Sequence, residues 1–567
     1  MYKFKRKHIF LFIFICALAV RLFYTIQLEK VFFSDALVMD ESTYDNWAIR
    51  ILEKDILTDS KPFWQAPFYP YFLALVYYIG GHNYLLVRFI QALLGLCNCL
   101  LIFNITKRIF GETTALIAFF ATAFYGMFIF FGGQILNITL NLFLNLFLLF
   151  MLMKACRMQK ASFFFYAGTI FGLSAITRPT ILIFLPFLLL WLFWFLKETK
   201  LRRVCSFIAN LLLGLILIIS ITALRNYIVS GQKVFISTYG GINFYIGNNP
   251  NYDQTVALQP GSQFAYLVNK PIREANIEDA KSKAASQFWY KKASEFIVTK
   301  PKSYLTLLLK KFYLFWNGFE IARYMDYYLI RKFIPFLKLP FISFRLISPL
   351  ALCGIFICIK MILQSRFKYP NYLPLLLLFT FSNMLGVILY FVTSPYRIPV
   401  VACLIIFASF FIHEAARQLK NKNFKFLLTF FIIGATLGWI TNSNLYQNLK
   451  VNEAFNDRLL CGSCMEKADY VSAISYCKSS VEKDPNVLES WFWLAEANLK
   501  SGHLQKAEST CRYSFTFVTE TAGMHKLLGD ILKARNLHKE AVIEYQKALR
   551  LNPDFIDAKE ALLEINI

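Results

Sequence analysis

The sequence lacks the motifs of several large functional classes. It holds only six histidines in 567 residues, and no pair of them has the spacing of a metalloenzyme site. It also lacks a glycine-rich phosphate loop that ends in Lys-Ser or Lys-Thr, which argues against a nucleotide-driven pump. Acidic residues lie almost entirely outside the long apolar runs, and their scarcity there argues against an ion-coupled transporter.

Apolar residues dominate what is present. Hydrophobic residues make up 57% of the chain, which includes 60 phenylalanines, and the mean hydropathy is +0.48. Because apolar runs of about 20 residues recur, we expect a multi-pass membrane protein surrounded by membrane lipid. The net charge of +25 comes from basic residues in loops, many of them short; such clusters are typical of orientation signals, so we expect no nucleic-acid partner.

The N-terminus has features of a signal peptide but is too long for one. Lys3, Lys5, Arg6 and Lys7 precede an apolar stretch over residues 9–26, and no small-x-small cleavage site follows it. We therefore expect an uncleaved first span with its basic end in the cytoplasm.

The pattern predicts an all-α fold, a polytopic membrane bundle of about eleven spans followed by an α-solenoid. Two long loops, 29–83 and 225–344, then lie outside, as does the solenoid, because the short inner loops hold most of the basic residues. These inner basic residues include Lys197, Arg202, Lys360, Arg366 and Lys368. The expected setting is a bacterial inner membrane, with both loops and the solenoid in the periplasm. The expected spans are 8–28, 84–105, 113–131, 135–153, 162–178, 180–196, 205–224, 345–363, 372–392, 398–413 and 425–441.

Beyond residue 442 the apolar runs stop and a repeat begins. Ala473, Ala507 and Ala541 recur at a spacing of 34 residues. A 34-residue period with small residues where helices cross is typical of tetratricopeptide repeats. We expect a membrane domain over 1–444 and a repeat domain over 453–567 that recruits a protein partner.

Polar residues at the predicted outer surface carry the candidate chemistry. Asp40 and Glu41 follow the first span, and a carboxylate there is able to accept a proton. Arginine beside hydrocarbon is costly unless it is paired or interfacial, so Arg178, Arg225 and Arg397 together suggest a site for an anion, most plausibly a phosphate. For each arginine alone, the alternative is a side chain that snorkels to the interface. Physical reasoning alone leaves Asp35, Asp45 and Asp59 as other candidates for the base.

Several short motifs point to one family. They are Asp40-Glu41-x-x-Tyr44, Ala66-Pro67-Phe68-Tyr69-Pro70-Tyr71, Thr177-Arg178-Pro179, and Arg225-Asn226-Tyr227 leading to Gly247-Asn248-Asn249-Pro250. Together they resemble motifs of the GT-C glycosyltransferases related to protein O-mannosyltransferases and to the lipid A aminoarabinose transferase. The resemblance extends over roughly residues 5–440.

The resemblance implies a glycosyltransferase with an outward-facing site. It implies a polyprenyl-phosphate sugar donor, an acceptor hydroxyl on a protein, lipid or glycan, and Asp40 as the catalytic base of an inverting transfer. Glu41 is then an accessory acid. Donor phosphate binding is expected at Arg178, Arg225 and Arg397, and a substrate loop at Tyr44, Gly247, Asn248 and Asn249.

The sequence also departs from the family pattern. Many relatives place an acid near the start of the fourth span, where Gln134, Asn137 and Thr139 stand here. We therefore expect no metal ligand among these residues and assign no cofactor, and a divalent metal stays possible. Relatives often have an additional arginine two residues before the equivalent of Arg397, whereas Pro395 occupies that position.

The cysteines of the repeat domain allow two interpretations. Cys461 and Cys464 have the spacing of a redox or zinc half-site, but they fall on the first repeat helix. Cys477 and Cys511 are 34 residues apart, which indicates equivalent packing positions. We expect structural packing for all four.

Two other functions remain open. One is an oligosaccharide ligase or polymerase, a class that also combines many spans with repeats. The other is a non-enzymatic transporter or membrane-anchored scaffold that acts through the repeats alone.

Overall fold

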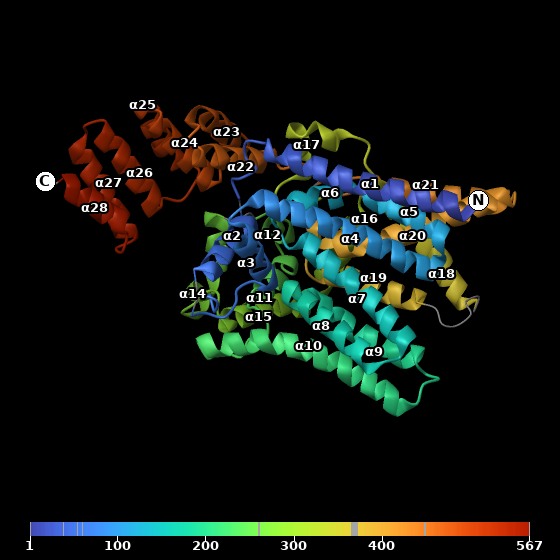
Figure 1. Cartoon of the computed structure of the whole chain (residues 1–567). Helices are drawn as coiled ribbons and strands as arrows, with labels where there is room; N and C mark the ends of the chain where they lie inside the picture. Colours follow the sequence, from blue (N-terminus) through green and yellow to red (C-terminus); the bar gives the residue numbers. More distant parts are fainter. Residues whose placement is uncertain are drawn as a thin grey trace. The chain divides into compact units, whose positions relative to one another are not determined.

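The computed structural model describes residues 2–37, 39–53, 55–58, 60–258, 261–364, 372–446 and 449–565, and their regular secondary structure is helical (Figure 1). Within these ranges an isolated bridge between Tyr125 and Ile342 is the one β-type pairing. The all-α prediction is thereby confirmed. Asp59, Arg366, Lys368 and the last two residues of the expected repeat domain lie outside the described ranges.

The chain divides into two compact units. One, here called the membrane unit, comprises Met1–Val31, Met39–Leu258 and Val268–Leu449. The other, here called the repeat unit, comprises Phe32–Val38, Gln259–Leu267 and Lys450–Ile567. Two short pieces of the expected outer loops therefore group with the repeat helices.

Apolar sequence and glycine or proline punctuation set the helices of the membrane unit. Gly111 and Gly231, for example, follow helix ends with positive φ values of 87° and 65°, which a residue without Cβ adopts at little cost. The helices are α1 (Tyr2–Glu29), α2 (Asp40–Leu52), α3 (Phe68–Gly80), α4 (Tyr84–Phe110), α5 (Glu112–Ala123), α6 (Gly126–Gly133), α7 (Ile138–Met158), α8 (Ala161–Thr177), the 3-10 helix η1 (Pro179–Ile183), α9 (Phe184–Phe195), α10 (Leu201–Ser230), α11 (Gly240–Gly247), α12 (Tyr252–Ala257), α14 (Lys270–Ala275), α15 (Lys283–Thr299), α16 (Pro301–Trp316), α17 (Tyr327–Phe333), the 3-10 helix η2 (Pro335–Lys338), α18 (Phe344–Leu363), α19 (Leu373–Leu389), α20 (Ser394–Lys420) and α21 (Phe424–Asn442).

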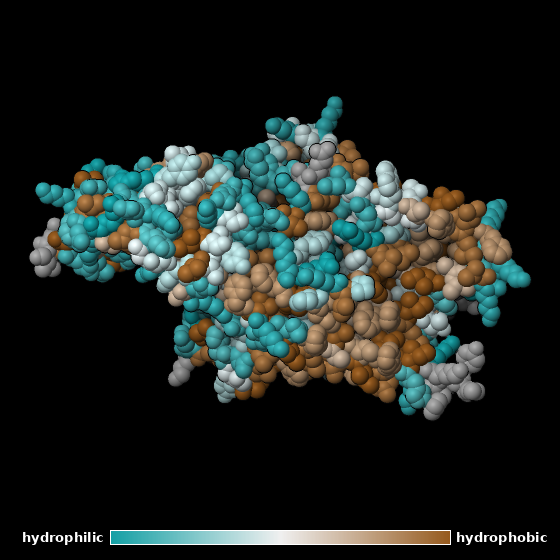
Figure 2. Space-filling view, turned by 90° about the horizontal axis from the view of Figure 1, so that it is seen from above, coloured by the Kyte–Doolittle hydropathy of each residue, from teal (hydrophilic) through white to brown (hydrophobic). Residues whose placement is uncertain are grey.

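Seven helices among the described residues are long and apolar enough to cross a membrane. They lie in α1, α4, α7, α10, α18, α20 and α21, and each coincides with an expected span. In the view of Figure 2, hydrophobic residues cover much of the membrane unit's surface. An integral membrane protein is therefore the correct class.

The other four expected spans are shorter helices, so the count of eleven is not confirmed. α8 and α19 have 17 residues each, and α9 has 12 and continues the 3-10 turn η1. At about 1.5 Å per residue, 17 residues measure about 26 Å, less than the hydrocarbon thickness of about 30 Å. The span expected over 113–131 is broken after α5, because the Gly126 N–H bonds to the Ile342 carbonyl.

Close helix packing fixes the end of α8. A Cβ on Gly168 would lie 1.9 Å from the Leu211 carbonyl oxygen, and one on Gly214 would lie 2.3 Å from that of Phe165. Small residues at such crossings are typical of membrane helices, whose backbones then approach closely. The tight pairing of α8 with α10 holds Thr177 and the following Arg178 in place.

The repeat unit consists of short helices that pack in succession. The 34-residue period is visible in its core, because Ala473, Ala507 and Ala541 are all fully buried. Side chains of Asp469 and Thr521 accept hydrogen bonds from backbone N–H groups at two helix starts. This arrangement agrees with the expected solenoid. The helices are α13 (Ser262–Val268), which straddles both units, α22 (Glu453–Glu466), α23 (Tyr470–Lys483), α24 (Leu488–Lys500), α25 (Leu504–Ser514), α26 (Ala522–Ala534), α27 (His538–Leu551) and α28 (Ile556–Ile565).

A disulfide corrects one expectation for the cysteines. Cys461 on α22 bonds to Cys477 on α23, with their Cα atoms 5.2 Å apart, within the range that a disulfide spans. Cys464 and Cys511 are free and buried, as expected of packing residues. Cys461 and Cys477 therefore form a covalent bond between two helices, which their separate spacing patterns did not reveal.

Side chains of the repeat helices hold the two loop pieces in the repeat unit. The Glu489 carboxylate accepts a hydrogen bond from the backbone N–H of Ser262, and Gln263 Nε2 donates to the Asn486 carbonyl over 2.9 Å. Phe32 stacks on Tyr476 with ring centroids 6.5 Å apart. The repeat unit thus contains its own segment of each outer loop.

Candidate active site

A cavity of about 230 Å³ opens within the membrane unit. Its lining residues come from elements that are far apart in sequence: the start of α2, the loop before α3, α7, the end of α8, α11, α19 and the start of α20. The lining combines carboxylate, guanidinium, amide and phenol groups with an apolar wall. The polar members include Asp40, Tyr44, Gln65, Asn137, Asn141, Asn145, Thr177, Arg178, Tyr239, Asn243, Tyr324, Asn383, Tyr390 and Tyr396.

Asp40 lies at the cavity as the first residue of α2. Its Oδ1 accepts a hydrogen bond from Gln65 Nε2 over 3.2 Å, so the carboxylate is oriented by the loop before α3. It is the one acidic residue among the described residues of the lining. The other candidates lie elsewhere: Asp45 accepts from Tyr77 over 2.7 Å, and Asp35 from Ser34 over 3.2 Å.

Tyrosines surround Asp40. Tyr44 is buried in the lining, and its hydroxyl accepts from Asn137 Nδ2 over 3.3 Å. Burial, and then the Asp40 charge, raise the pKa of Tyr44, and the same two causes raise the pKa of Tyr324. These phenols therefore stay protonated at neutral pH and remain available as hydrogen-bond donors.

Arg178 lies in the same cavity as Asp40. It follows α8 directly, its guanidinium stacks 3.8 Å over the Tyr396 ring, and its Nη1 donates to the Pro395 carbonyl over 3.4 Å. Among the described residues no carboxylate forms an ion pair with it, and burial lowers its pKa. A half-buried cation without an acid beside it is suited to hold an anion.

Arg225 occupies a different place. Its guanidinium is buried beneath the loop before α3, where it donates to the carbonyls of Leu57 and Lys61 over 2.6 and 2.7 Å. It also stacks on the Phe63 ring at 3.9 Å. Arg225 is absent from the cavity lining, and its observed contacts hold the loop that carries Gln65.

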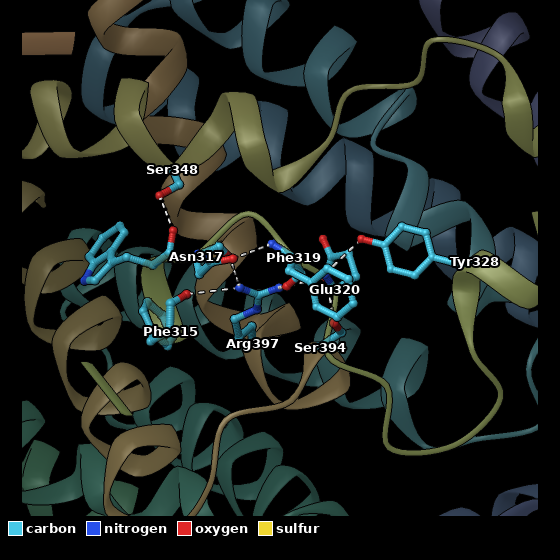
Figure 3. A network of polar contacts seen from close by, with 9 residues as sticks. Phe315, Asn317, Phe319, Glu320, Tyr328, Ser348, Ser394 and Arg397 are labelled. Atoms are coloured by element: carbon cyan, nitrogen blue, oxygen red, sulfur yellow. Dashed lines mark hydrogen bonds and ion pairs between the residues drawn. The ribbon is translucent and has the colours of Figure 1, made fainter. Parts of the chain in front are cut away.

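Arg397 also donates hydrogen bonds to backbone carbonyls. Figure 3 shows its side chain among the carbonyls of residues 315–319, and its Nη1 and Nη2 donate to the carbonyls of Phe315, Asn317 and Phe319. Nη2 also pairs with the Glu320 carboxylate over 2.8 Å. The side chain is 1% exposed. Of the three predicted arginines, the structure thus brings only Arg178 to the cavity, because the other two are engaged with backbone carbonyls.

Glu41 points away from Asp40 despite being its neighbour in sequence. It is buried, and its Oε1 accepts from the backbone N–H of Ile135 over 3.0 Å. That contact fixes the turn between α6 and α7. Glu41 therefore supports the wall of the cavity from behind instead of lining it.

Gly247, Asn248 and Asn249 stabilise a turn behind the cavity. A Cβ at position 247 would lie 1.9 Å from the Tyr390 carbonyl oxygen, so only glycine fits there. Asn248 donates to the Leu389 carbonyl over 2.8 Å, and Asn249 donates to the Thr255 hydroxyl over 2.8 Å. They contact the protein's own backbone and side chains, so of the four expected substrate-loop residues only Tyr44 lines the cavity.

Sequence reasoning missed the amide side chains of the site. Asn137 lies just before α7, and Asn141 and Asn145 follow within α7 at intervals of four residues, so that all three face the cavity. Gln65 and Asn243 complete this group. The sequence signal for these residues is an asparagine at every fourth position of a run rich in Leu and Phe. A buried amide in a membrane helix needs a hydrogen-bond partner, so such a row points to a polar site.

The part of the chain that the structure describes holds no group of three or more His, Cys, Asp or Glu side chains placed to bind a metal ion. At the cavity, Asp40 is the one carboxylate among described lining residues.

With this geometry in place, the chain can be compared with known proteins. Residues 61–223 match the family model described as Dolichyl-phosphate-mannose-protein mannosyltransferase. The membrane unit resembles a GT-C glycosyltransferase. The match includes Gln65, the α7 asparagines and Arg178, and it confirms the resemblance drawn from the motifs.

Two solved structures share a loose likeness with the chain. The Archaeoglobus fulgidus oligosaccharyltransferase in the apo form is 12% identical, with a TM-score of 0.41, and the match covers 81% of this chain and 59% of that one. ArnT from Cupriavidus metallidurans, bound to undecaprenyl phosphate, is 14% identical, with a TM-score of 0.40, over 96% of this chain and 80% of that one. We draw nothing on function from either. No curated protein matches the sequence.

Proposed function

We propose that the chain is an integral membrane glycosyltransferase that moves a sugar from a polyprenyl-phosphate donor to an acceptor hydroxyl on the outer face of the membrane. The observation that carries the proposal is that Asp40 and Arg178, a carboxylate and a cation without an acid partner, line one cavity. The family match over residues 61–223 supports the same class of reaction.

The two residues have complementary roles in this proposal. Asp40 accepts the proton of the acceptor hydroxyl, and the acceptor oxygen forms a bond to the anomeric carbon. The bond between that carbon and the phosphate oxygen breaks, and the electron pair leaves with the polyprenyl phosphate. Arg178 stabilises the charge that develops on the phosphate. One displacement with one base inverts the configuration at the anomeric carbon.

The neighbours of Asp40 and Arg178 keep the site in order. Gln65 orients Asp40, Tyr396 supports the guanidinium of Arg178, and Glu41 fixes the turn that leads into α7. Arg225 and Arg397 act at a distance by holding loops. Preorganised polar groups of this kind cost no rearrangement when the charge develops.

The orientation with both long loops and the repeat unit on the outer face is part of the proposal. An odd number of crossings, seven or eleven, puts the repeat unit opposite the N-terminus. The disulfide between Cys461 and Cys477 supports an outer location, because disulfides persist in oxidising compartments. We propose a bacterial periplasm, where the repeat unit recruits a protein acceptor or partner through its helical surface.

Reconstitution with two donors tests the proposal. The purified chain is placed in liposomes with an envelope extract and either undecaprenyl-phosphate-[14C]mannose or a radiolabelled undecaprenyl-diphosphate oligosaccharide. We expect label to leave the monophosphate donor, with release of undecaprenyl phosphate. Consumption of the diphosphate donor alone would identify an oligosaccharide ligase or polymerase, and consumption of neither would favour a scaffold or transporter.

A further inference from the structure

Buried amide groups in the cavity lack hydrogen-bond partners. Gln65 Oε1 and Asn243 Oδ1 are both buried, and neither has a partner within the part of the chain described. Both residues line the cavity. The orientation of Gln65 is set by its other end, because its Nε2 donates to Asp40. Because a buried acceptor without a partner is unfavourable, each of these oxygens calls for a donor from a ligand.

A second set of amides lines the cavity, on α7. Asn141 and Asn145 are 2% exposed, in a helix with no charged side chain in its apolar stretch. Asn145 Oδ1 accepts from the Ser174 hydroxyl over 2.7 Å, and its Nδ2 donates to Asn141 Oδ1 over 3.5 Å. This chain of bonds holds both amides in a fixed orientation toward the cavity.

Each charged side chain of the described cavity lining already has a role in the proposed reaction. Asp40 and Arg178 are the only charged side chains among the described lining residues, and the proposed reaction uses both. Among the described lining residues no further acid is present to pair with a sugar ammonium group, and no further cation to pair with a sugar carboxylate. Arg323, which interacts with Asp40, is buried outside the lining and donates to the Val256 and Leu258 carbonyls. Burying either charge without a partner is strongly unfavourable.

The cavity has room for a sugar ring with its hydroxyl groups, because its volume of about 230 Å³ is many times the roughly 10–15 Å³ of cavity volume that holds one water molecule.

We infer that this cavity is a subsite for one neutral monosaccharide, and that Gln65, Asn243, Asn141 and Asn145 determine specificity by hydrogen-bonding its hydroxyl groups. The inference rests on the proposed function, since the sugar is the one carried by the polyprenyl phosphate. A site built around hydroxyl groups discriminates strongly, because a ligand without them leaves the buried amides unpaired. Neutral hexoses or pentoses fit, whereas amino sugars and uronic acids do not.

Binding measurements with matched probes test this inference. The affinity of the full chain in nanodiscs is measured for bare undecaprenyl phosphate and for its mannose, glucose, galactose, glucosamine and glucuronic acid derivatives. At least one neutral sugar should bind about tenfold more tightly than the bare lipid phosphate, and the two charged sugars should bind no more tightly than it does.

Substitution locates the effect in the amides. Asn145→Leu and Asn243→Leu, which come from different helices, should each reduce the gain from the neutral sugar about tenfold while the affinity for bare undecaprenyl phosphate is kept. Asn104→Leu, an exposed asparagine on α4, is the control and should change neither affinity. If one of the two cavity variants does not fold, the other suffices.

The outcomes distinguish failure of the sugar subsite from failure of the proposed glycosyl transfer. A preference for glucosamine or glucuronic acid, the absence of any gain from a neutral sugar, or full retention of the gain in both cavity variants would overturn the inference and leave the proposed function intact. Absence of binding to every lipid phosphate would count against the proposed function itself.

Discussion

Gln65 donates a hydrogen bond from its Nε2 to Asp40 Oδ1 over 3.2 Å, although 25 residues separate the two. The loop that carries Gln65 is itself held by Arg225 and Asn226 at the end of α10. The proposed base is therefore positioned by a segment that one of the predicted phosphate-binding arginines holds in place.

Replacement of Gln65 tests this positioning. Gln65→Leu removes the donor that orients the Asp40 carboxylate, so we expect kcat to fall about tenfold while the affinity for undecaprenyl phosphate and the thermal midpoint are kept. Gln65→Asn should give an intermediate kcat. An unchanged kcat in Gln65→Leu, or a loss that only follows a lower thermal midpoint, would contradict the positioning role.

Glu41 should matter less than Asp40. Glu41→Gln keeps an oxygen that accepts from the Ile135 N–H, so we expect a loss of activity of less than about tenfold. Glu41→Leu leaves that N–H unpaired and should lower the thermal midpoint in detergent. A Glu41→Gln variant as inactive as Asp40→Asn would show that Glu41 takes part in the chemistry.

The buried arginines should separate into two classes. Arg397→Gln leaves the Glu320 carboxylate buried without its cation, which costs about 3–5 kcal/mol, so the folded fraction should fall. Arg178→Gln should keep the thermal midpoint within a few degrees but reduce transfer about 10²–10³-fold. Thermal melts and transfer assays on both proteins check this, and equal losses of stability would contradict it.

The stability of the protein should depend on the charge of Lys311, which lies on α16. Burial lowers the pKa of Lys311 to about 7, and a neutral amine still has the two N–H groups that bond Asn248 Oδ1 and the Tyr390 carbonyl, each over 2.9 Å. Since the unfolded chain binds this proton up to about pH 10.4, stability from this group should rise between about pH 7 and pH 10, by up to about 1.4 kcal/mol per pH unit. Thermal melts of Lys311→Met should lack this rise, and those of Lys302→Met, an exposed lysine of the same helix, should keep it.

The disulfide between α22 and α23 should stabilise the repeat unit. Cys461 and Cys477 lie 16 positions apart in the sequence, and closing a loop of about 15 residues stabilises a fold by about 3 kcal/mol. Cys461→Ser and Cys477→Ser should lower the thermal midpoint to the same extent, whereas Cys464→Ser should have a smaller effect. Thiol labelling of unfolded, unreduced protein should leave two cysteines unmodified, and labelling of all twelve would contradict the link.

The membrane class, the helical repeats and Asp40 as a candidate followed from the sequence because each depends on local pattern. The length of an apolar run predicts a membrane span, a 34-residue period predicts stacked helix pairs, and the motif at residues 40–44 predicted a residue that lines the cavity. The span count did not follow, because α8 and α19, with 17 residues each, are shorter than the hydrocarbon thickness, and because backbone hydrogen bonds of Ile342 to Phe124 and Gly126 interrupt the apolar run after α5.

The roles of the arginines required the structure. Arg178, Arg225 and Arg397 look alike in sequence, since each follows an apolar run on the expected outer side. What separates them is the position of backbone carbonyls from distant segments, those of Leu57 and Lys61 for Arg225 and those of Phe315 and Phe319 for Arg397. No local pattern encodes such long-range contacts, and the same reason hid the pairing of Cys461 with Cys477.

The most direct measurement compares sugar transfer by purified wild-type protein with that of Asp40→Asn and of Asp35→Asn, a matched change at an exposed acid of the same outer loop. Each is reconstituted with a radiolabelled polyprenyl-phosphate sugar and an envelope extract, and its affinity for undecaprenyl phosphate is measured alongside. We predict that Asp40→Asn binds the lipid but transfers no sugar, and that Asp35→Asn behaves as wild type. Undiminished transfer by Asp40→Asn would contradict the account.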